Sequence, residues 1–137
     1  MPRPKILLVD DEPTHIRLFQ DMLEETGAQV HVAGDGIEAL DALEASDASD
    51  VSGEAKSKPF DLVLMDIRLP RLDGVQATLR IRDSRTAYCN VPIIGVTAYS
   101  LPQETGVFLQ MGMNAALCKP VDPEHFLATV RRFIPRP

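Results

Sequence analysis

Four short runs of apolar residues, spread along the chain, each lead directly into polar residues. Such near-continuous apolar runs are typical of parallel β-strands that helices cover on both faces. The carboxyl ends of parallel strands share one edge of the sheet, and ligands bind at that edge. The pattern therefore indicates both a fold class and the place of a site. The runs are 6–9, 60–65, 92–96 and 115–118, and the polar residues after them are Asp10, Asp11, Asp66, Thr97 and Lys119.

Segments with helical periodicity alternate with these runs, so the sequence predicts a doubly wound α/β fold. A fifth run alternates apolar and polar residues, which suits an edge strand. The expected architecture is a flavodoxin-like (βα)5 three-layer sandwich whose parallel five-stranded sheet has the order 2-1-3-4-5. Strands are expected at about 5–9, 29–33, 60–65, 92–97 and 115–118, and helices at about 14–26, 36–45, 74–83, 101–111 and 123–134.

Several expected helices carry signals at their ends and on their buried faces. Gly27 suits a helix end, Asp122 with Pro123 suits a helix start, and 100–103 resembles a capping box. Gly106 lies inside the fourth helix and costs it about 1 kcal/mol relative to alanine, so we expect that helix to be loosely held. The faces expected to be buried consist of Ile16, Phe19, Met22 and Leu23; Ile37, Leu40 and Leu43; Val75 and Leu79; and Phe126, Val130 and Phe133.

Length and composition restrict the class of protein. Residues 1–137 are expected to form one domain, with a core at about 5–134 and a mobile polar loop at about 46–59. A formal net charge of −6 argues against nucleic acid or an anionic membrane as the main partner. No apolar run has the length of a membrane span, and the first residues do not resemble a secretory signal. Two cysteines without metal-binding spacing fit unpaired thiols in a cytoplasmic protein.

Three carboxylates at one edge of a sheet would repel one another unless a cation lay among them. Asp10 and Asp11 follow the first strand, and Asp66 follows the third, which is its expected neighbour. A set of oxygen ligands suits Mg²⁺ (or Mn²⁺), and Mg²⁺ commonly takes substrate phosphate as a further ligand. We expect Asp11 to bind the ion directly, Asp10 to bind it mainly through water, and the backbone carbonyl of Arg68 to add a ligand.

These residue types suit the transfer of a phosphoryl group to a carboxylate. Asp66 would be the nucleophile and would become an acyl phosphate. Lys119 would place a positive charge on a phosphoryl oxygen, while the hydroxyl of Thr97 and the backbone amide of Ala98 would contact another. A cis peptide bond before Pro120 would direct Lys119 toward the site, since cis bonds occur chiefly before proline.

Six short segments combine these residues in a specific order at the expected strand ends. They are 8–12 (LVDDE), 64–70 (LMDIRLP), 73–74 (DG), 96–98 (VTA), 112–114 (GMN) and 119–120 (KP). With this order the chain resembles a response-regulator receiver domain over about residues 5–133. The resemblance implies that a histidine kinase or a histidine phosphotransfer protein donates a phosphoryl group to Asp66. It also implies a signalling switch that catalyses only its own phosphorylation and dephosphorylation, and not a metabolic enzyme.

The resemblance also implies how such a domain passes on a signal. The last helix lies close to the end of the sequence, so we expect a free, single-domain receiver whose output is contact with a downstream protein. The family suggests that this contact uses the face formed by helix 4, strand 5 and helix 5. A receiver taken from a longer kinase or regulator would show the same sequence features.

Two positions depart from the usual receiver pattern. Ala116 stands where receivers carry a Tyr or Phe that changes rotamer as the threonine moves, so this coupling route is expected to be missing. Tyr99 is expected to shield the phosphate and tune its hydrolysis. Arg68 stands two residues after Asp66, where neutral side chains are common; it either pairs with Glu12, contacts the phosphoryl group or a partner, or is solvated.

Other classes of protein fit the sequence less well. A phosphatase of the haloacid-dehalogenase type needs a second acid where Arg68 stands. A flavin-binding flavodoxin needs a phosphate loop rich in Ser, Thr or Gly after the first strand, where acidic residues would repel phosphate. A receiver-like domain that only binds partners is disfavoured because every expected site residue is present. His15 lies near the acidic pair, but Mg²⁺ disfavours imidazole, so we do not expect His15 to bind the metal or carry the phosphoryl group.

Overall fold

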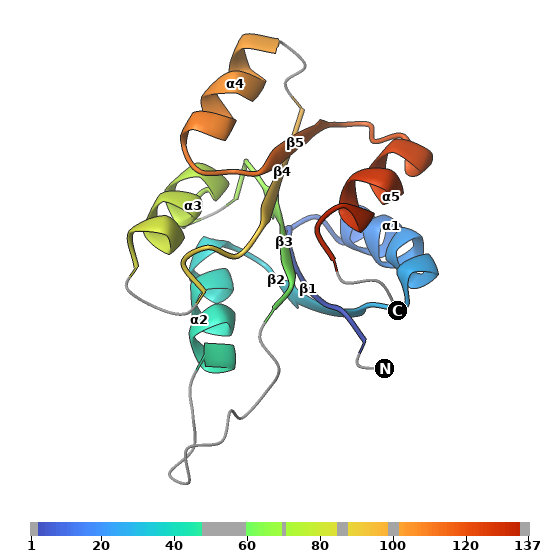
Figure 1. Cartoon of the computed structure of the whole chain (residues 1–137), viewed down its shortest axis with the longest axis horizontal. Coiled ribbons are helices and arrows are strands. Elements are labelled where there is room, and N and C mark those ends of the chain that lie inside the picture. The colour runs from blue at the N-terminus through green and yellow to red at the C-terminus, as the bar shows by residue number, and fades with distance from the viewer. Residues whose placement is uncertain (1–2, 48–59, 70, 85–87, 99–101, 135–137) are drawn as a thin grey trace, which may run out of the picture.

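The computed structural model describes residues 3–47, 60–69, 71–84, 88–98 and 102–134, in which five parallel strands form one sheet (Figure 1). Each strand pairs in parallel with its neighbours in the order β2-β1-β3-β4-β5. This order confirms the flavodoxin-like, doubly wound fold expected from the sequence. The strands are β1 (Lys5–Val9), β2 (Gln29–Ala33), β3 (Leu62–Asp66), β4 (Ile93–Thr97) and β5 (Ala115–Cys118).

Helices cover both faces of the sheet, with α1 and α5 on one side and α2, α3 and α4 on the other (Figure 1). A short 3₁₀ turn, η1 (Glu24–Thr26), extends the first helix. The three layers therefore enclose two cores that share the central strands. The helices are α1 (Pro13–Leu23), α2 (Gly36–Asp47), α3 (Gly74–Asp83), α4 (Pro102–Gln110) and α5 (Pro123–Arg131).

The two cores explain why the central strands are apolar along their whole length. In β1, Leu7 and Val9 belong to the core that includes residues of α2, α3 and α4, whereas Ile6 and Leu8 belong to the core that includes residues of α1 and α5. All five residues of β3, Leu62–Asp66, are likewise buried. The edge strand β2 alternates between exposed and partly buried residues, as its sequence pattern predicts.

Helix starts and ends follow the expected capping chemistry. The carboxylate of Asp122 accepts a hydrogen bond from the amide of His125 at 3.0 Å, and Pro123 occupies the first helical turn of α5. Gly27 ends η1 with a φ of 74°, in the left-handed region that glycine enters without strain. These local signals therefore fix where α5 begins and where the first helical segment ends.

The structure corrects two details of the sequence interpretation. α2 continues to Asp47, so the polar loop expected from residue 46 starts later, and residues 48–59 lie outside the described part. Leu79, expected to be buried, is 46% exposed, because the buried face of α3 is formed by Ala77, Thr78 and Ile81. The capping box expected at 100–103 falls largely outside the described residues.

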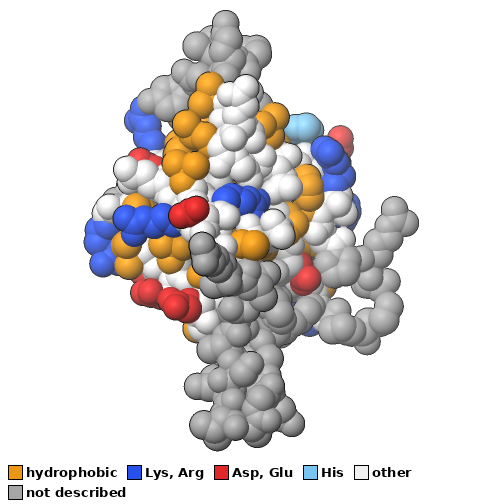
Figure 2. Space-filling model, turned by 60° about the vertical axis from the view of Figure 1, so that its left-hand side comes forward, with side chains coloured by type: hydrophobic (Ala, Val, Ile, Leu, Met, Phe, Trp, Pro, Cys, Tyr) orange, Lys and Arg blue, Asp and Glu red, His pale blue; other side chains and the backbone are white. Residues whose placement is uncertain are grey.

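The surface carries few large apolar side chains. Those exposed in the described part are Leu18 on α1, Leu79 on α3, and Val107 and Leu109 on α4. Hydrophobic side chains gather over α4 in the upper part of Figure 2, and charged side chains lie below them. None of the described helices has the length and hydropathy needed to cross a membrane.

Gly106 provides a test of how firmly α4 is held. A Cβ atom built at this position meets no heavy atom within 4 Å, so alanine fits there without a clash. We predict that Gly106→Ala raises the free energy of unfolding by about 0.5–1 kcal/mol, because alanine loses less backbone entropy in a helix interior than glycine. Urea denaturation would measure this change, and hydrogen exchange in α4 should slow.

Gly36→Ala is the matched control for this substitution. A Cβ atom on Gly36 would collide with the carbonyl oxygen of Leu72, so the same change is expected to destabilise the fold. Hydrogen exchange in α4 that is already as slow as in α5 would contradict a loosely held helix.

Candidate functional site

The carboxyl ends of four strands bring the predicted site residues to one edge of the sheet. Val9 pairs with Met65, which places the residues after β1 beside the end of β3. Thr97, the last residue of β4, pairs with Cys118, the last residue of β5. The parallel register therefore gathers residues that lie far apart in the sequence.

Three carboxylates meet at this edge. Asp10, Asp11 and Asp66 each offer an oxygen, and these oxygens lie within 4.8 Å of one another. Asp10 and Asp66 are buried, with 1% and 7% of their surface exposed, whereas Asp11 is exposed. Two buried carboxylates and one open to solvent form a donor set that fits a hard divalent cation such as Mg²⁺ or Mn²⁺.

The electrostatics of Asp10 reflect this crowding. Burial raises the pKa of Asp10 above its usual value, and repulsion from Asp66 adds to the rise. The amide of Glu12, which donates to Oδ1 of Asp10 at 3.0 Å, opposes the rise, as do Lys119 and His15. The ionised site is therefore costly to form without further positive charge.

Lys119 is the cation closest to the buried acids among the described residues. Its Nζ lies 3.2 Å from Oδ2 of Asp66 and 3.9 Å from Oδ2 of Asp10. The backbone amide of Lys119 donates to the carbonyl oxygen of Thr97 at 2.7 Å, which fixes the start of the side chain. The peptide bond between Lys119 and Pro120 is cis, as the sequence analysis expected.

The segment after β3 contacts Asp66 through its backbone. The amide of Arg68 donates to Oδ1 of Asp66 at 3.1 Å, and the amide of Gly74 donates to the carbonyl oxygen of Ile67 at 3.0 Å. A side chain on Gly74 would collide with the carbonyl oxygen of Asp66, so glycine allows this close approach. Asp73 then caps α3 by accepting from the amide of Gln76.

A second contact ties this loop to the turn after β2. Arg71 has a φ of 61°, and its Nε donates to Oδ2 of Asp35 at 2.6 Å. The Arg71 guanidinium holds the pKa of Asp35 below its usual value. Asp35 also caps α2 by accepting from the amide of Glu38, and the amide of Gly36 donates to the carbonyl oxygen of Leu72. Neither Asp35 nor Arg71 was predicted from the sequence to belong to the site.

The remaining predicted residues have different positions. Thr97 is buried at the end of β4, and Ala98 follows it on the surface. The side chain of Arg68 is exposed, and the metal-binding role of its carbonyl stays a prediction. Ala116 is half-buried and packs against the core formed with α2, α3 and α4. Tyr99 lies outside the described residues.

His15 is a site residue that the sequence analysis set aside. It lies on the first turn of α1, and its Nδ1 is 3.3 Å from Nζ of Lys119 and 3.8 Å from Oδ2 of Asp10. The sequence offers one signal that His15 lies near the site, which is its place in the helix directly after the acidic pair. The contact with Lys119 could not be predicted from local sequence, because it joins residues 104 positions apart.

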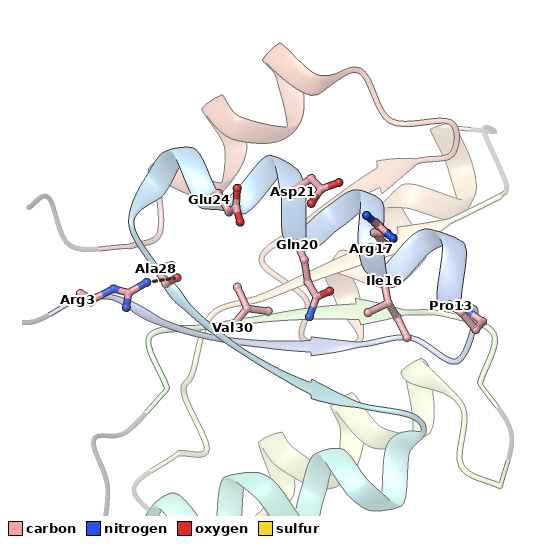
Figure 3. A pocket seen from close by; sticks show the side chains of 9 residues that line it. All are labelled: Arg3, Pro13, Ile16, Arg17, Gln20, Asp21, Glu24, Ala28 and Val30. Atoms are coloured by element: carbon pink, nitrogen blue, oxygen red, sulfur yellow. Dashed lines mark hydrogen bonds between the residues drawn. The ribbon is translucent and has the colours of Figure 1, made fainter.

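Two hollows adjoin α1. One, of about 300 Å³, opens beside Lys119 and is lined by His15, Leu18, Phe19, Lys119, Pro120 and Val121. The other, of about 650 Å³, lies between α1 and β2, away from the carboxylate cluster (Figure 3). Its rim includes Arg3, which donates to the carbonyl oxygens of Gly27 and Ala28. Only the smaller hollow shares residues with the site.

Comparison with known families agrees with this geometry. The model of the response regulator receiver domain matches residues 6–131. The chain therefore belongs to the response-regulator receiver family, whose domains act in two-component signalling.

The relatives include sensor histidine kinases and response regulators. The sensor histidine kinase GacS of Pseudomonas protegens is 34% identical over 132 residues, a match that covers 95% of this chain but 13% of GacS. The receiver domain of the sensor histidine kinase PA1611 from Pseudomonas aeruginosa, solved with magnesium in its active-site cleft, is 34% identical, with a TM-score of 0.78 and coverage of 96% and 98% of the two chains. The chemotaxis response regulator CheY4 of Vibrio cholerae is 26% identical, with a TM-score of 0.80 and coverage of 96% and 99%.

The raised pKa of Asp10 leads to a prediction about stability. Because the folded-state pKa lies above the ordinary value of 3.8, the ionised carboxylate opposes folding at neutral pH. Without metal, Asp10→Asn should therefore be more stable than the natural chain at pH 7. The gain should shrink as the pH falls toward 3.8 and both states of Asp10 become protonated. Thermal unfolding at several pH values would measure it.

Mg²⁺ should make the natural chain more stable than Asp10→Asn. A ligand that binds only the folded state stabilises it by mass action, so Mg²⁺ should raise the Tm of the natural chain and affect Asp10→Asn much less. Asp21→Asn, an exposed change on α1, is the control and should respond to Mg²⁺ like the natural chain. An equal Mg²⁺ effect on Asp10→Asn would contradict a metal site at Asp10.

Proposed function

We propose that this receiver takes a phosphoryl group from a histidine kinase or a histidine phosphotransfer protein onto Asp66. The observation that carries the proposal is the environment of that carboxylate. An oxygen of Asp66 lies within 4.8 Å of an oxygen of each of two further carboxylates, and Oδ2 of Asp66 lies 3.2 Å from the ammonium group of Lys119. A nucleophile, a cation-binding set and a fixed positive charge are the parts that phosphoryl transfer to an aspartate needs.

In the proposed reaction, an oxygen of the Asp66 carboxylate attacks phosphorus as the bond from phosphorus to the donor's histidine nitrogen breaks. The electron pair of that bond returns to the imidazole. Lys119 places its ammonium group on a phosphoryl oxygen, and the hydroxyl of Thr97 and the amide of Ala98 contact another. Hydrolysis resets the switch when water attacks the same phosphorus, the bond from phosphorus to the Asp66 oxygen breaks, and phosphate leaves the regenerated carboxylate.

Asp10, Asp11 and Asp66 would hold Mg²⁺ or Mn²⁺, together with the backbone carbonyl of Arg68. When bound, the ion offsets the negative charge of the carboxylates and of the phosphoryl group. Asp11 would bind the ion directly and Asp10 mainly through water. The exposure of Asp11 supports its direct role, since an exposed carboxylate is open to an ion arriving from solvent, whereas Asp10 is buried.

The surroundings of the site support protein partners on two sides. The 300 Å³ hollow beside Lys119 has an apolar wall that includes Leu18, Phe19 and Val121, where a donor could bring its histidine near Asp66. Output is proposed to use the face of α4, β5 and α5; the exposed large apolar side chains of α4 are Val107 and Leu109. We propose a cytoplasmic location and no nucleic-acid partner, in keeping with the net charge of −6.

Intact-protein mass tests the acceptor directly. After treatment with acetyl phosphate and Mg²⁺, the natural chain is expected to gain a single phosphoryl adduct, and Asp66→Asn is expected to gain none. The adduct should also be lost when Mg²⁺ is removed with a chelator. No adduct on the natural chain, together with no NMR change on adding beryllofluoride and Mg²⁺, would overturn the proposed function.

Arg68 is expected to modulate the lifetime of the phosphoryl group. Its amide donates to the carboxylate of Asp66, and its side chain, two residues further along the chain, is exposed. We predict that Arg68→Ala changes the half-life of the adduct by a larger factor than it changes the affinity for Mg²⁺. Decay of the adduct by mass and titration by Mg²⁺ would compare the two. Arg80→Ala, an exposed arginine on α3, is the control, and an unchanged half-life in Arg68→Ala would refute this role.

A further inference from the structure

We infer that His15 is a positioning residue for Lys119, an inference that rests on the proposed phosphoryl transfer to Asp66. The geometry places Nδ1 of His15 3.3 Å from Nζ of Lys119, and Nζ in turn lies 3.2 Å from Oδ2 of Asp66. The lysine ammonium is thereby held between a helix residue and the acceptor carboxylate.

The chemistry of the lysine side chain determines which atom donates and which accepts in this hydrogen bond. An ammonium group has three N–H donors and no lone pair, so Nδ1 of His15 is the acceptor. The tautomer that makes this contact is the one with its proton on Nε2. At 3.8 Å, Oδ2 of Asp10 is too far from Nδ1 for a hydrogen bond, so Lys119 is the hydrogen-bond partner of Nδ1.

Lys119 needs such a partner because two buried acids compete for it. The ammonium group is at the end of a flexible four-carbon chain, and Asp10, the more deeply buried acid, lies only 3.9 Å away. Of the described residues, only Asp66 and His15 accept hydrogen bonds from Nζ. His15 therefore holds the ammonium at Asp66, where the phosphoryl group arrives, and leaves Asp10 for the cation.

The local structure makes His15 a firm anchor. Pro13 begins α1, and the side chain of Glu12 caps the helix by accepting from the amide of Thr14 at 3.2 Å. His15 lies in this same first turn, its side chain is 41% exposed, and it lines the hollow that opens beside Lys119. It thus lies at the entrance of the site.

Three substitutions distinguish the loss of the hydrogen-bond acceptor of His15 from the loss of the bulk of its ring. The oxygen of His15→Asn can occupy the place of Nδ1, the oxygen of His15→Gln reaches further toward Nε2, and His15→Leu offers no acceptor. We expect His15→Leu and His15→Gln to slow adduct formation from acetyl phosphate by about three- to tenfold, the range for one lost hydrogen bond. His15→Asn should restore most of the rate.

A double mutant tests whether His15 acts through Lys119. In a Lys119→Ala background, His15→Leu should cause no further slowing, since the group that it positions is gone. Equal slowing in both backgrounds would overturn the inference, as would full activity of His15→Leu. Thermal unfolding of each variant would show whether a change in rate follows from lost stability, in which case His15→Asn would not rescue it.

NMR of ¹⁵N-lysine in the metal-free protein supplies a readout that does not depend on activity. The ammonium signal of Lys119 should shift, and its protons should exchange faster, in His15→Leu but not in His15→Asn. An unchanged Lys119 signal in His15→Leu would overturn the role of His15 whether or not an adduct forms. A natural chain that gains no adduct would instead overturn the proposed function, so the two failures are distinguishable.

Discussion

Two buried carboxylates at the ends of neighbouring strands dominate the electrostatics of the site. Asp10 and Asp66 are both removed from water, and burial together with their mutual repulsion raises the pKa of Asp10. Lys119, 3.2 Å from Asp66, supplies one positive charge against the negative charge of three carboxylates. The site is therefore short of positive charge, and this deficit favours the binding of a divalent cation. The same deficit makes the position of the Lys119 ammonium group important.

The fold creates this crowding through the register of its sheet. β1 and β3 are adjacent and parallel, so the acidic residues at their ends cannot move apart without breaking strand pairs. The loop after β3 is similarly constrained, because Gly74 lies against the carbonyl oxygen of Asp66 and Arg71 is bonded to Asp35. Rigid strands and an anchored loop thus hold in place an arrangement of charges that would not persist in a flexible segment.

The sequence predicts the features that depend on neighbouring residues and on strand ends. The cap at Asp122 is local, and the apolar runs place Asp66 and Lys119 at strand ends before any contact is known. Features that depend on exact helical phase or on distant partners were missed. Leu79 was expected to be buried from its spacing to Val75, but tertiary packing turns the face of Ala77 and Ile81 inward. The contacts of His15 with Lys119 and of Arg71 with Asp35 cross the fold and leave no pattern in the sequence.

The small side chain at position 116 bears on how phosphorylation could reach a partner. Ala116 packs against the core formed with α2, α3 and α4, but a methyl group has no alternative rotamer with which to follow a movement of Thr97. α4 is joined to β4 through the segment that begins at Ala98, and Phe108 is its buried anchor in that core. Gly106 lowers the intrinsic stability of this helix, so its displacement costs less than that of a well-formed helix. A change at Thr97 is therefore more readily transmitted by moving α4 as a unit than by a rotamer switch in β5.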